Sequence, residues 1–308
     1  MAEIKIGISG WTYPPWRGTF YPKGLPQKRE LAFASRQVSS IEINGSFYSL
    51  QRPSSYQSWY AAVPDDFIFS VKANRYITHI RRLLDIERPL ANFFASGVLA
   101  LREKLGPILW QFPPSFKFDS RRFKNFLEIL PRTTHEAARL AKRHDAWMAG
   151  RTWVETDDDR PLLHTIEIRN QSFETEEFVA MMRAYEIPIV FSDSGGKWPY
   201  IEEVTGGFVY LRLHGAEELY ASGYDDAALD DWESRIRIWM SGRTRKIASL
   251  AQAKVPRKAR GVFVYFDNDA KIHAPFDAIA LLERLTDFRP EFRYPEFRHK
   301  DKEAEKAA

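Results

Sequence analysis

The 308-residue chain contains no cysteine. Disulfides, thiolate nucleophiles, iron–sulfur clusters and cysteine-ligated structural zinc are therefore excluded. The chain also has no apolar run long enough to cross a membrane, and its N-terminus enters a predicted strand without the basic and apolar regions of a signal peptide. No P-loop or dinucleotide-binding glycine motif is present. We therefore expect a cytoplasmic protein with no membrane partner.

Charge of one sign is not in large excess. The chain has 45 basic and 41 acidic residues, a net charge of +4 and a pI near 9.1. Such a balance permits an anionic partner without requiring one, so nucleic acid stays a possible partner. Neither composition nor charge indicates an oligomeric state.

What the chain does contain is a series of short apolar runs that end in polar side chains. Such runs, rich in β-branched and aromatic residues, are typical of strands buried on both faces. They cover residues 4–9, 38–44, 67–72, 108–112, 163–169, 187–193, 208–214 and 261–269. Stretches with helical spacing lie between them, including 90–105 and 133–148.

Eight such strands with helical connections predict an α/β TIM (β/α)8 barrel in a single domain. We expect this domain to span residues 1–298, with residues 132–162 as an elaboration between the fourth and fifth strands. The charged, alanine-rich segment 299–308 is expected to be disordered.

The polar residues at the strand ends define a candidate site, because the C-terminal ends of barrel strands meet at one mouth. Neighbouring carboxylates raise one another's pKa and arginine lowers it, so a mixed cluster can hold an acid and a base at neutral pH. Arginine can also clamp phosphate or carboxylate, and aromatic rings can stack on a base or sugar. The catalytic candidates are Glu42, Lys72, Glu167, His214 and Asp267, and the ligand-binding candidates are Trp11, Asn44, Tyr48, Gln111, Arg169, Asp193, Arg212 and Asp269.

Eight motifs in this order resemble the YecE-like family, domain of unknown function 72. They are Gly7-Ile8-Ser9-Gly10-Trp11, Glu42-Ile43-Asn44 with Phe47-Tyr48, Phe69-Ser70-Val71-Lys72, Gln111-Phe112-Pro113-Pro114-Ser115-Phe116, Glu167-Ile168-Arg169, Asp193, Arg212-Leu213-His214-Gly215, and Tyr265-Phe266-Asp267-Asn268-Asp269. The resemblance runs from about Gly7 to Leu285 and implies a TIM barrel without an assigned biochemical role.

The chain departs from the family pattern after Glu167-Ile168-Arg169. The family usually has a histidine there, followed two residues later by Ser-Trp, whereas this chain has Asn170, Gln171, Ser172 and Phe173. Asparagine cannot carry a proton as histidine can, so this position is left out of any mechanism.

Three hypotheses follow for the mouth of the barrel. The first is an enzyme that uses acid–base chemistry on an anionic, phosphate- or sugar-containing ligand. The second is a metal-dependent hydrolase or isomerase, similar to sugar isomerases and abasic-site endonucleases, with Mg or Mn held by Glu42, Glu167, Asp193, His214 and Asp267; the absence of paired-histidine spacing speaks against it. The third is a non-catalytic barrel that binds nucleic acid or protein.

Water at an open mouth would relieve much of the cost of losing a charge there. Glu167→Gln and Asp267→Asn are therefore expected to leave the melting temperature nearly unchanged, or to raise it, while they abolish ligand binding or turnover.

Overall fold

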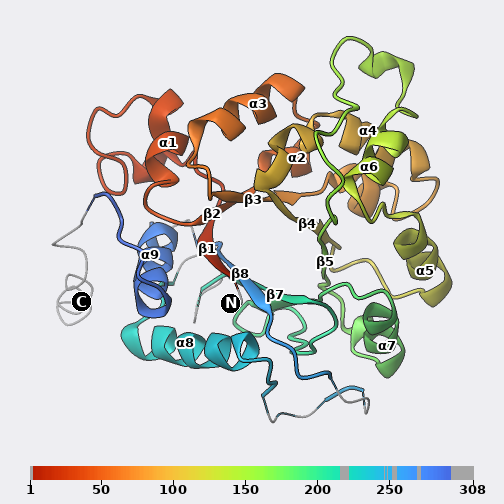
Figure 1. The fold of residues 1–308 in the computed structure, drawn as a ribbon. Helices are drawn as coiled ribbons and strands as arrows, with labels where there is room; N and C mark the ends of the chain where they lie inside the picture. Colours follow the sequence, from red (N-terminus) through yellow and green to blue (C-terminus); the bar gives the residue numbers. More distant parts are fainter. Residues whose placement is uncertain are drawn as a thin grey trace.

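The computed structural model describes residues 3–215, 222–245, 247, 249–251, 255–268 and 272–292. Eight parallel strands form one sheet that curves around a common axis (Figure 1). They are β1 (Ile4–Ser9), β2 (Ser40–Ile43), β3 (Ile68–Lys72), β4 (Leu105–Gln111), β5 (His164–Glu167), β6 (Val190–Asp193), β7 (Phe208–Leu213) and β8 (Gly261–Phe266). Their order around the sheet is β5-β4-β3-β2-β1-β8-β7-β6. This arrangement confirms the predicted TIM barrel.

The two ends of the sheet, β5 and β6, meet at a seam. One isolated parallel bridge joins Ile166 to Ile189, and the backbone N–H of Ile166 donates to the carbonyl of Pro188 at 3.0 Å. Proline has no N–H to donate to a ladder. The barrel is therefore closed at the seam by fewer hydrogen bonds than join its other strands.

Helices surround the barrel on its outside (Figure 1). They are α1 (Glu30–Ala34), α2 (Gly45–Tyr48), α3 (Pro53–Ala62), α4 (Glu87–Ala95), α5 (Ser120–Ile129), α6 (Thr134–Ala141), α7 (Glu176–Ala184), α8 (Asp226–Met240) and α9 (His273–Leu285). The connection from β6 to β7, residues 194–207, contains no helix. Across the described ranges, no helix combines the length and the apolar character that a membrane crossing requires.

Two predicted helices were too long. The helix expected over 90–105 ends at Ala95, because Gly97 adopts a left-handed conformation with φ of 117°, and a separate 3-10 segment and β4 follow. The helix expected over 133–148 ends at Ala141. Beyond it, Asn92 exchanges two hydrogen bonds with Asp145, at 2.8 and 2.7 Å, which draw the backbone out of a helical path. Tertiary contacts here override the periodic pattern.

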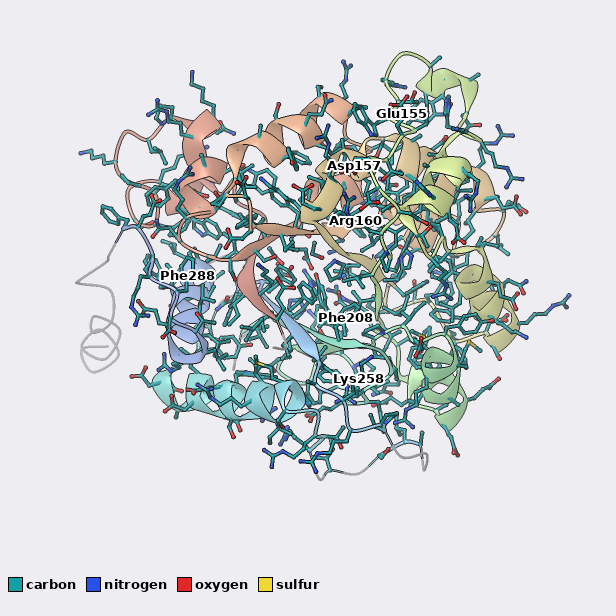
Figure 2. All side chains as sticks on the ribbon, viewed as in Figure 1. Glu155, Asp157, Arg160, Phe208, Lys258 and Phe288 are labelled. Atoms are coloured by element: carbon teal, nitrogen blue, oxygen red, sulfur yellow. The ribbon has the colours of Figure 1, made fainter. Side chains whose placement is uncertain are left out.

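Apolar side chains pack both between the sheet and the helices and inside the barrel. The interior group includes Leu109, Val190, Phe208 and Phe263. Figure 2 shows Phe208 beside β7 within the ring of strands. These residues fill the barrel toward the N-terminal ends of its strands. The polar side chains at the C-terminal ends therefore pack on a layer of apolar side chains.

Small residues occupy β1, β2 and β3, and those on β2 and β3 face two tyrosines in the barrel interior. A Cβ added to Gly7 would lie 1.7 Å from the carbonyl oxygen of Ser40, so only glycine fits there. The hydroxyl of Ser40 lies 2.7 Å from that of Tyr265, and the hydroxyl of Ser70 lies 2.7 Å from that of Tyr210. These paired hydroxyls form the layer directly beneath the candidate site.

Candidate functional site

Arg212, on β7, lies at the centre of the C-terminal end of the barrel. Its side chain is fully buried, and its guanidinium donates to three carboxylates from three other strand ends. The distances are 2.9 and 3.2 Å to Glu42, 3.0 Å to Glu167 and 2.7 Å to Asp267. Four of the sequence candidates thus meet at one point.

Backbone hydrogen bonds between neighbouring strands place these side chains. The N–H of Asp267 donates to Leu213 at 2.8 Å, and the N–H of Gly10 donates to the carbonyl of Glu42 at 2.8 Å. Along β7 successive side chains alternate between the two faces of the sheet, so Arg212 points into the barrel with Tyr210 below it. The geometry of the site therefore follows from strand register.

Glu42 and Glu167 are fully buried, and each accepts further hydrogen bonds. Glu42 accepts from the hydroxyls of Ser9 at 2.9 Å and Tyr210 at 2.6 Å. Glu167 accepts from Gln111 at 2.8 Å and from Arg169 at 2.9 Å. A buried carboxylate is tolerated where its oxygens are bonded in this way.

Burial alone would raise the pKa of Glu167, but the charges of Arg169 and Arg212 hold it well below its usual range. The pKa of Asp267 is lowered as well, because Arg212 and the hydrogen bond from His214 outweigh the effect of burial. The carboxylates in turn raise the pKa of Arg212, although burial opposes this. Glu167, Asp267 and Arg212 are therefore ionised at neutral pH.

His214 lies between two of these carboxylates. Its Nδ1 is 3.1 Å from Oδ2 of Asp267, and its Nε2 is 3.9 Å from Oε1 of Glu167. Burial lowers the pKa of His214, although the hydrogen bond to Asp267 acts in the opposite direction. The imidazole is thus a neutral partner of the ionised Asp267.

The side chain of Arg169 is more exposed than that of Arg212. Its exposed fraction is 13%, whereas that of Arg212 is zero. Its guanidinium stacks on the indole of Trp198, with 3.6 Å between the guanidinium carbon and the ring centroid. The edge of the same indole meets His214, with ring centroids 5.4 Å apart. Trp198 therefore covers both residues on the side of the β6–β7 connection.

Lys72, the last residue of β3, differs from the two arginines in its pairing. Its nitrogen lies 4.4 Å from the centroid of the Phe47 ring, and within the described residues it forms no hydrogen bond or ion pair. The residue is 8% exposed, and solvent still reaches its nitrogen. Burial and the charge of Arg212 lower the pKa of Lys72 to about 8. An amine in this state can accept or donate a proton near neutral pH.

His79 lies next to this lysine on a π-helical turn, Tyr76–Ile80. Its ring meets Phe47 edge to face at 5.0 Å, and burial together with the charge of Lys72 lowers its pKa to about 4. The backbone here is held by Ser46, whose hydroxyl donates to the carbonyl of Lys72 at 2.6 Å. His79 is thus a neutral imidazole beside the amine.

Five ligand-binding candidates lie outside the central group of hydrogen bonds. Asn44 is half-buried, and its Oδ1 has no hydrogen-bond partner among the described residues. Tyr48 is 69% exposed and packs edge to face on Phe47. Asp193 accepts from Tyr224 at 2.8 Å, and burial raises its pKa. Trp11, two residues after β1, packs on Trp59 of α3 with ring centroids 5.3 Å apart, and Asp269 lies outside the described residues.

The sequence candidates did not include Ser9, Tyr210, Trp198 and His79. Tyr210 could have been found, because it is two residues before Arg212 and shares its face. Trp198 lies on the β6–β7 connection and His79 on a single π-helical turn, so no sequence pattern indicated them. Asn170, where the family usually has histidine, bonds the carbonyl of Pro114 with its side chain.

The metal hypothesis can be compared with the same geometry. Over the ranges that the structure covers, no three histidine, aspartate or glutamate side chains are arranged to hold a metal ion. The guanidinium of Arg212 lies where carboxylates from β2, β5 and β8 converge. A protein cation thus occupies the place that a metal would take among these three carboxylates.

A barrel of eight parallel strands, with a buried arginine–carboxylate cluster over their C-terminal ends, defines a TIM-barrel protein with its candidate site in the usual place. A model of the family described as "Protein of unknown function DUF72" matches residues 5–300, and the chain belongs to that family.

Known proteins agree with this assignment. The chain is similar to UPF0759 protein YunF of Bacillus subtilis (strain 168), with 21% identity over 92% of this chain and 94% of the relative. A DUF72 family protein from Thermotoga maritima MSB8 has a similar structure, with a TM-score of 0.68 and 22% identity over 92% of this chain and 99% of the other. Another, from Enterococcus faecalis V583, has a TM-score of 0.64 and 17% identity over 94% and 100%. At these identities the solved structures support the fold alone.

Proposed function

We propose that the protein is an enzyme that performs acid–base chemistry on a small anionic molecule, bearing phosphate or a sugar, at the C-terminal mouth of the barrel. The observation that carries this proposal is the amine of Lys72. It lies beside the arginine–carboxylate cluster and, within the described residues, it is bonded to none of the carboxylates.

A structural lysine at a strand end is expected to pair with a carboxylate. Here Glu42, Glu167 and Asp267 are already bonded to Arg212. Burying an amine without a paired charge costs stability, so such a group is more often retained for function than for folding. Lys72 is accordingly our candidate for the group that takes a proton from the substrate.

Arg169 is the candidate group for holding the anion. One face of its guanidinium is covered by Trp198, and one edge is bonded to Glu167. The part that remains exposed can donate to a phosphate or carboxylate in the fixed geometry that arginine offers. The ammonium that Lys72 forms in this step can itself return the proton. Asp267, with His214 3.1 Å away, supplies a fixed negative charge at the same strand ends.

A second candidate function, a non-catalytic binding barrel, is favoured by one observation. Arg212, Glu42 and Glu167 are fully buried and bond mainly to one another. Groups in this state can brace a barrel without touching a ligand. The two functions differ in whether a bound anion exchanges protons with solvent.

Proton exchange can be measured directly. We would incubate the protein in D2O with a panel of sugar phosphates, keto acids and hydroxy acids, and follow deuterium incorporation and product formation by NMR. Wild-type protein is expected to label or convert at least one compound, and Lys72→Met is expected to abolish this. Lys117→Met is the matched control, because Lys117 is an exposed lysine on the loop after β4.

Two results would contradict the proposal. Saturable binding of an anion without any exchange or turnover would favour the binding barrel. Exchange that is undiminished in Lys72→Met would remove this lysine from the chemistry.

A further inference from the structure

A pocket lies between α1 and α3, beside the loop that follows β1. Its volume is about 600 Å³. It is lined by two tryptophans, Trp11 and Trp59, and by four polar residues, Thr12, Gln27, Lys28 and Ser58. None of its lining residues belongs to the arginine–carboxylate cluster or contacts Lys72, so it is separate from that cluster.

The two indoles form a corner. Their ring centroids are 5.3 Å apart and their planes meet at 80°. Both side chains are half-buried, and Trp59 is backed by Tyr56, whose ring meets it edge to face at 5.0 Å. The apolar face that each indole presents is therefore held in a fixed direction by packing behind it.

The loop that carries Trp11 is held as firmly. Tyr21 donates its hydroxyl to the carbonyl of Trp11, and Tyr13 donates to the carbonyl of Ser9 at 2.6 Å. Gly10 has a φ of 83°, a left-handed conformation that glycine adopts without strain. The position of Trp11 is thus fixed before any ligand arrives, which lowers the entropic cost of binding.

The polar groups around this corner are free to bind. Thr12, Gln27, Lys28 and Ser58 are exposed, and their side chains form no hydrogen bond or ion pair with any other described residue. The indole nitrogens of Trp11 and Trp59 are accessible to solvent. Several donors and one cation therefore border two apolar ring faces.

We infer that this pocket binds a sugar ring that carries an acidic group, of which a hexuronate is the simplest example. A pyranose has apolar C–H faces that pack on indole and hydroxyls at its edge that need donors and acceptors. Hydroxyl, amide and indole N–H groups provide these partners here. The ammonium of Lys28 adds a charge that a neutral sugar leaves unused.

The inference does not depend on the proposed function, because it concerns different residues. Its test uses glucuronate and glucose as probes, with binding measured by saturation-transfer NMR and by tryptophan fluorescence. Glucuronate is expected to bind saturably and more tightly than glucose. Lys28→Met is expected to weaken glucuronate binding by about two- to fivefold, the range of a solvent-exposed ion pair, and to leave glucose binding unchanged.

Variants locate the signal. Trp59→Ala is expected to abolish binding of both sugars, whereas Trp147→Ala is the matched control, because Trp147 is 56% exposed and lies far along the chain on another segment. Since loss of Trp59 also removes packing against Tyr56, Gln27→Ala serves as a second variant that leaves the core intact and is expected to weaken both sugars.

Three results would overturn the inference. One is the absence of a saturable response to glucuronate in the folded wild-type protein. Another is equal affinity for glucose and glucuronate. The third is binding that Gln27→Ala and Lys28→Met both leave unchanged, which would place the sugar elsewhere on the surface.

Discussion

Lys72 and Arg212 are buried cations at the same end of the barrel, and Arg212 takes the carboxylates that would otherwise pair with Lys72. The guanidinium is bonded to Glu42, Glu167 and Asp267, while the amine lies against the ring of Phe47. The positive charge of Arg212 is also the second cause, after burial, of the lowered pKa of Lys72. One cation thus stabilises the cluster and makes its neighbour easier to deprotonate.

The free energy of unfolding should depend on pH because of the lowered pKa of Lys72. The pKa of Lys72 is lowered from 10.5 to about 8, so below pH 8 the folded protein holds a proton that the unfolded chain binds more tightly. This corresponds to a cost of up to about 3 kcal/mol, which is fully present at pH 7 and disappears as the pH rises from 8 to 10.5. Lys72→Met is therefore expected to be more stable than wild type in urea unfolding at pH 7, and the gain should vanish near pH 10.5. A variant that is less stable at pH 7 would contradict this reasoning.

Loss of Arg212 should be far more costly than loss of Arg169. Arg212→Met leaves Glu42 and Glu167 buried without their shared counter-charge, a defect that costs roughly 3–5 kcal/mol. After Arg169→Met, Glu167 keeps its bonds from Gln111 and Arg212. Urea unfolding of both variants at pH 7 checks the order. Equal destabilisation would show that the central position of Arg212 has no energetic weight.

Two carboxylates of the cluster should respond differently to amide substitution. Both oxygens of Glu167 accept from donors, so an amide group in Glu167→Gln must face an arginine or Gln111, and the melting temperature should fall. Asp267 accepts through Oδ2 and is 14% exposed, so Asp267→Asn can keep that oxygen and turn its amide outward. Its melting temperature should change little. Thermal melts of the pair decide this, and both variants are expected to lose ligand binding or turnover.

Acid should destabilise the protein through His164. This histidine is buried, its Nδ1 accepts from the indole of Trp110 at 3.0 Å, and its Nε2 donates to the carbonyl of Pro131 at 2.7 Å. Burial lowers its pKa from 6.5 to about 4. The unfolded chain therefore gains a proton first as the pH falls, and stability should drop by about 3 kcal/mol between pH 6.5 and 4.

His164→Asn keeps an acceptor for Trp110 and removes the titrating group, so its stability should depend less on pH over this interval. His135→Asn, at an exposed position, is the control. Parallel pH profiles for wild type and His164→Asn would show that other groups cause the acid sensitivity.

The barrel could be predicted from the sequence because its strands carry their own signal. Each is a short apolar run with a polar end, and the alternation of side chains along 208–214 indicated that Arg212 and His214 share a face. The helix expected over 90–105 was wrong, because the left-handed Gly97 interrupts a pattern that looks continuous. Local periodicity therefore predicted the strands better than the helix ends.

The chemistry of the site was less accessible than its position. The sequence left open whether Lys72 pairs with a carboxylate. That pairing depends on which cation lies within hydrogen-bonding distance of Glu42, Glu167 and Asp267 in the folded barrel. It also suggested an open mouth, whereas Glu167 is fully buried, so the expectation of a nearly unchanged melting temperature is kept for Asp267→Asn alone. Pairing and burial are properties of the assembled barrel.

The seam between β5 and β6 connects the mechanics of the barrel to its candidate site. One bridge, Ile166 to Ile189, joins these strands, and above it the ion pair between Glu167 and Arg212 links β5 to β7 across the gap. Amide protons along the seam should accordingly exchange with solvent sooner than those of β1 and β8, which share a long ladder. When the seam opens, Glu167 moves away from its partner. Opening of the barrel at this seam therefore also breaks the ion pair between Glu167 and Arg212. A ligand that stabilises the arginine–carboxylate cluster would accordingly keep β5 and β6 together.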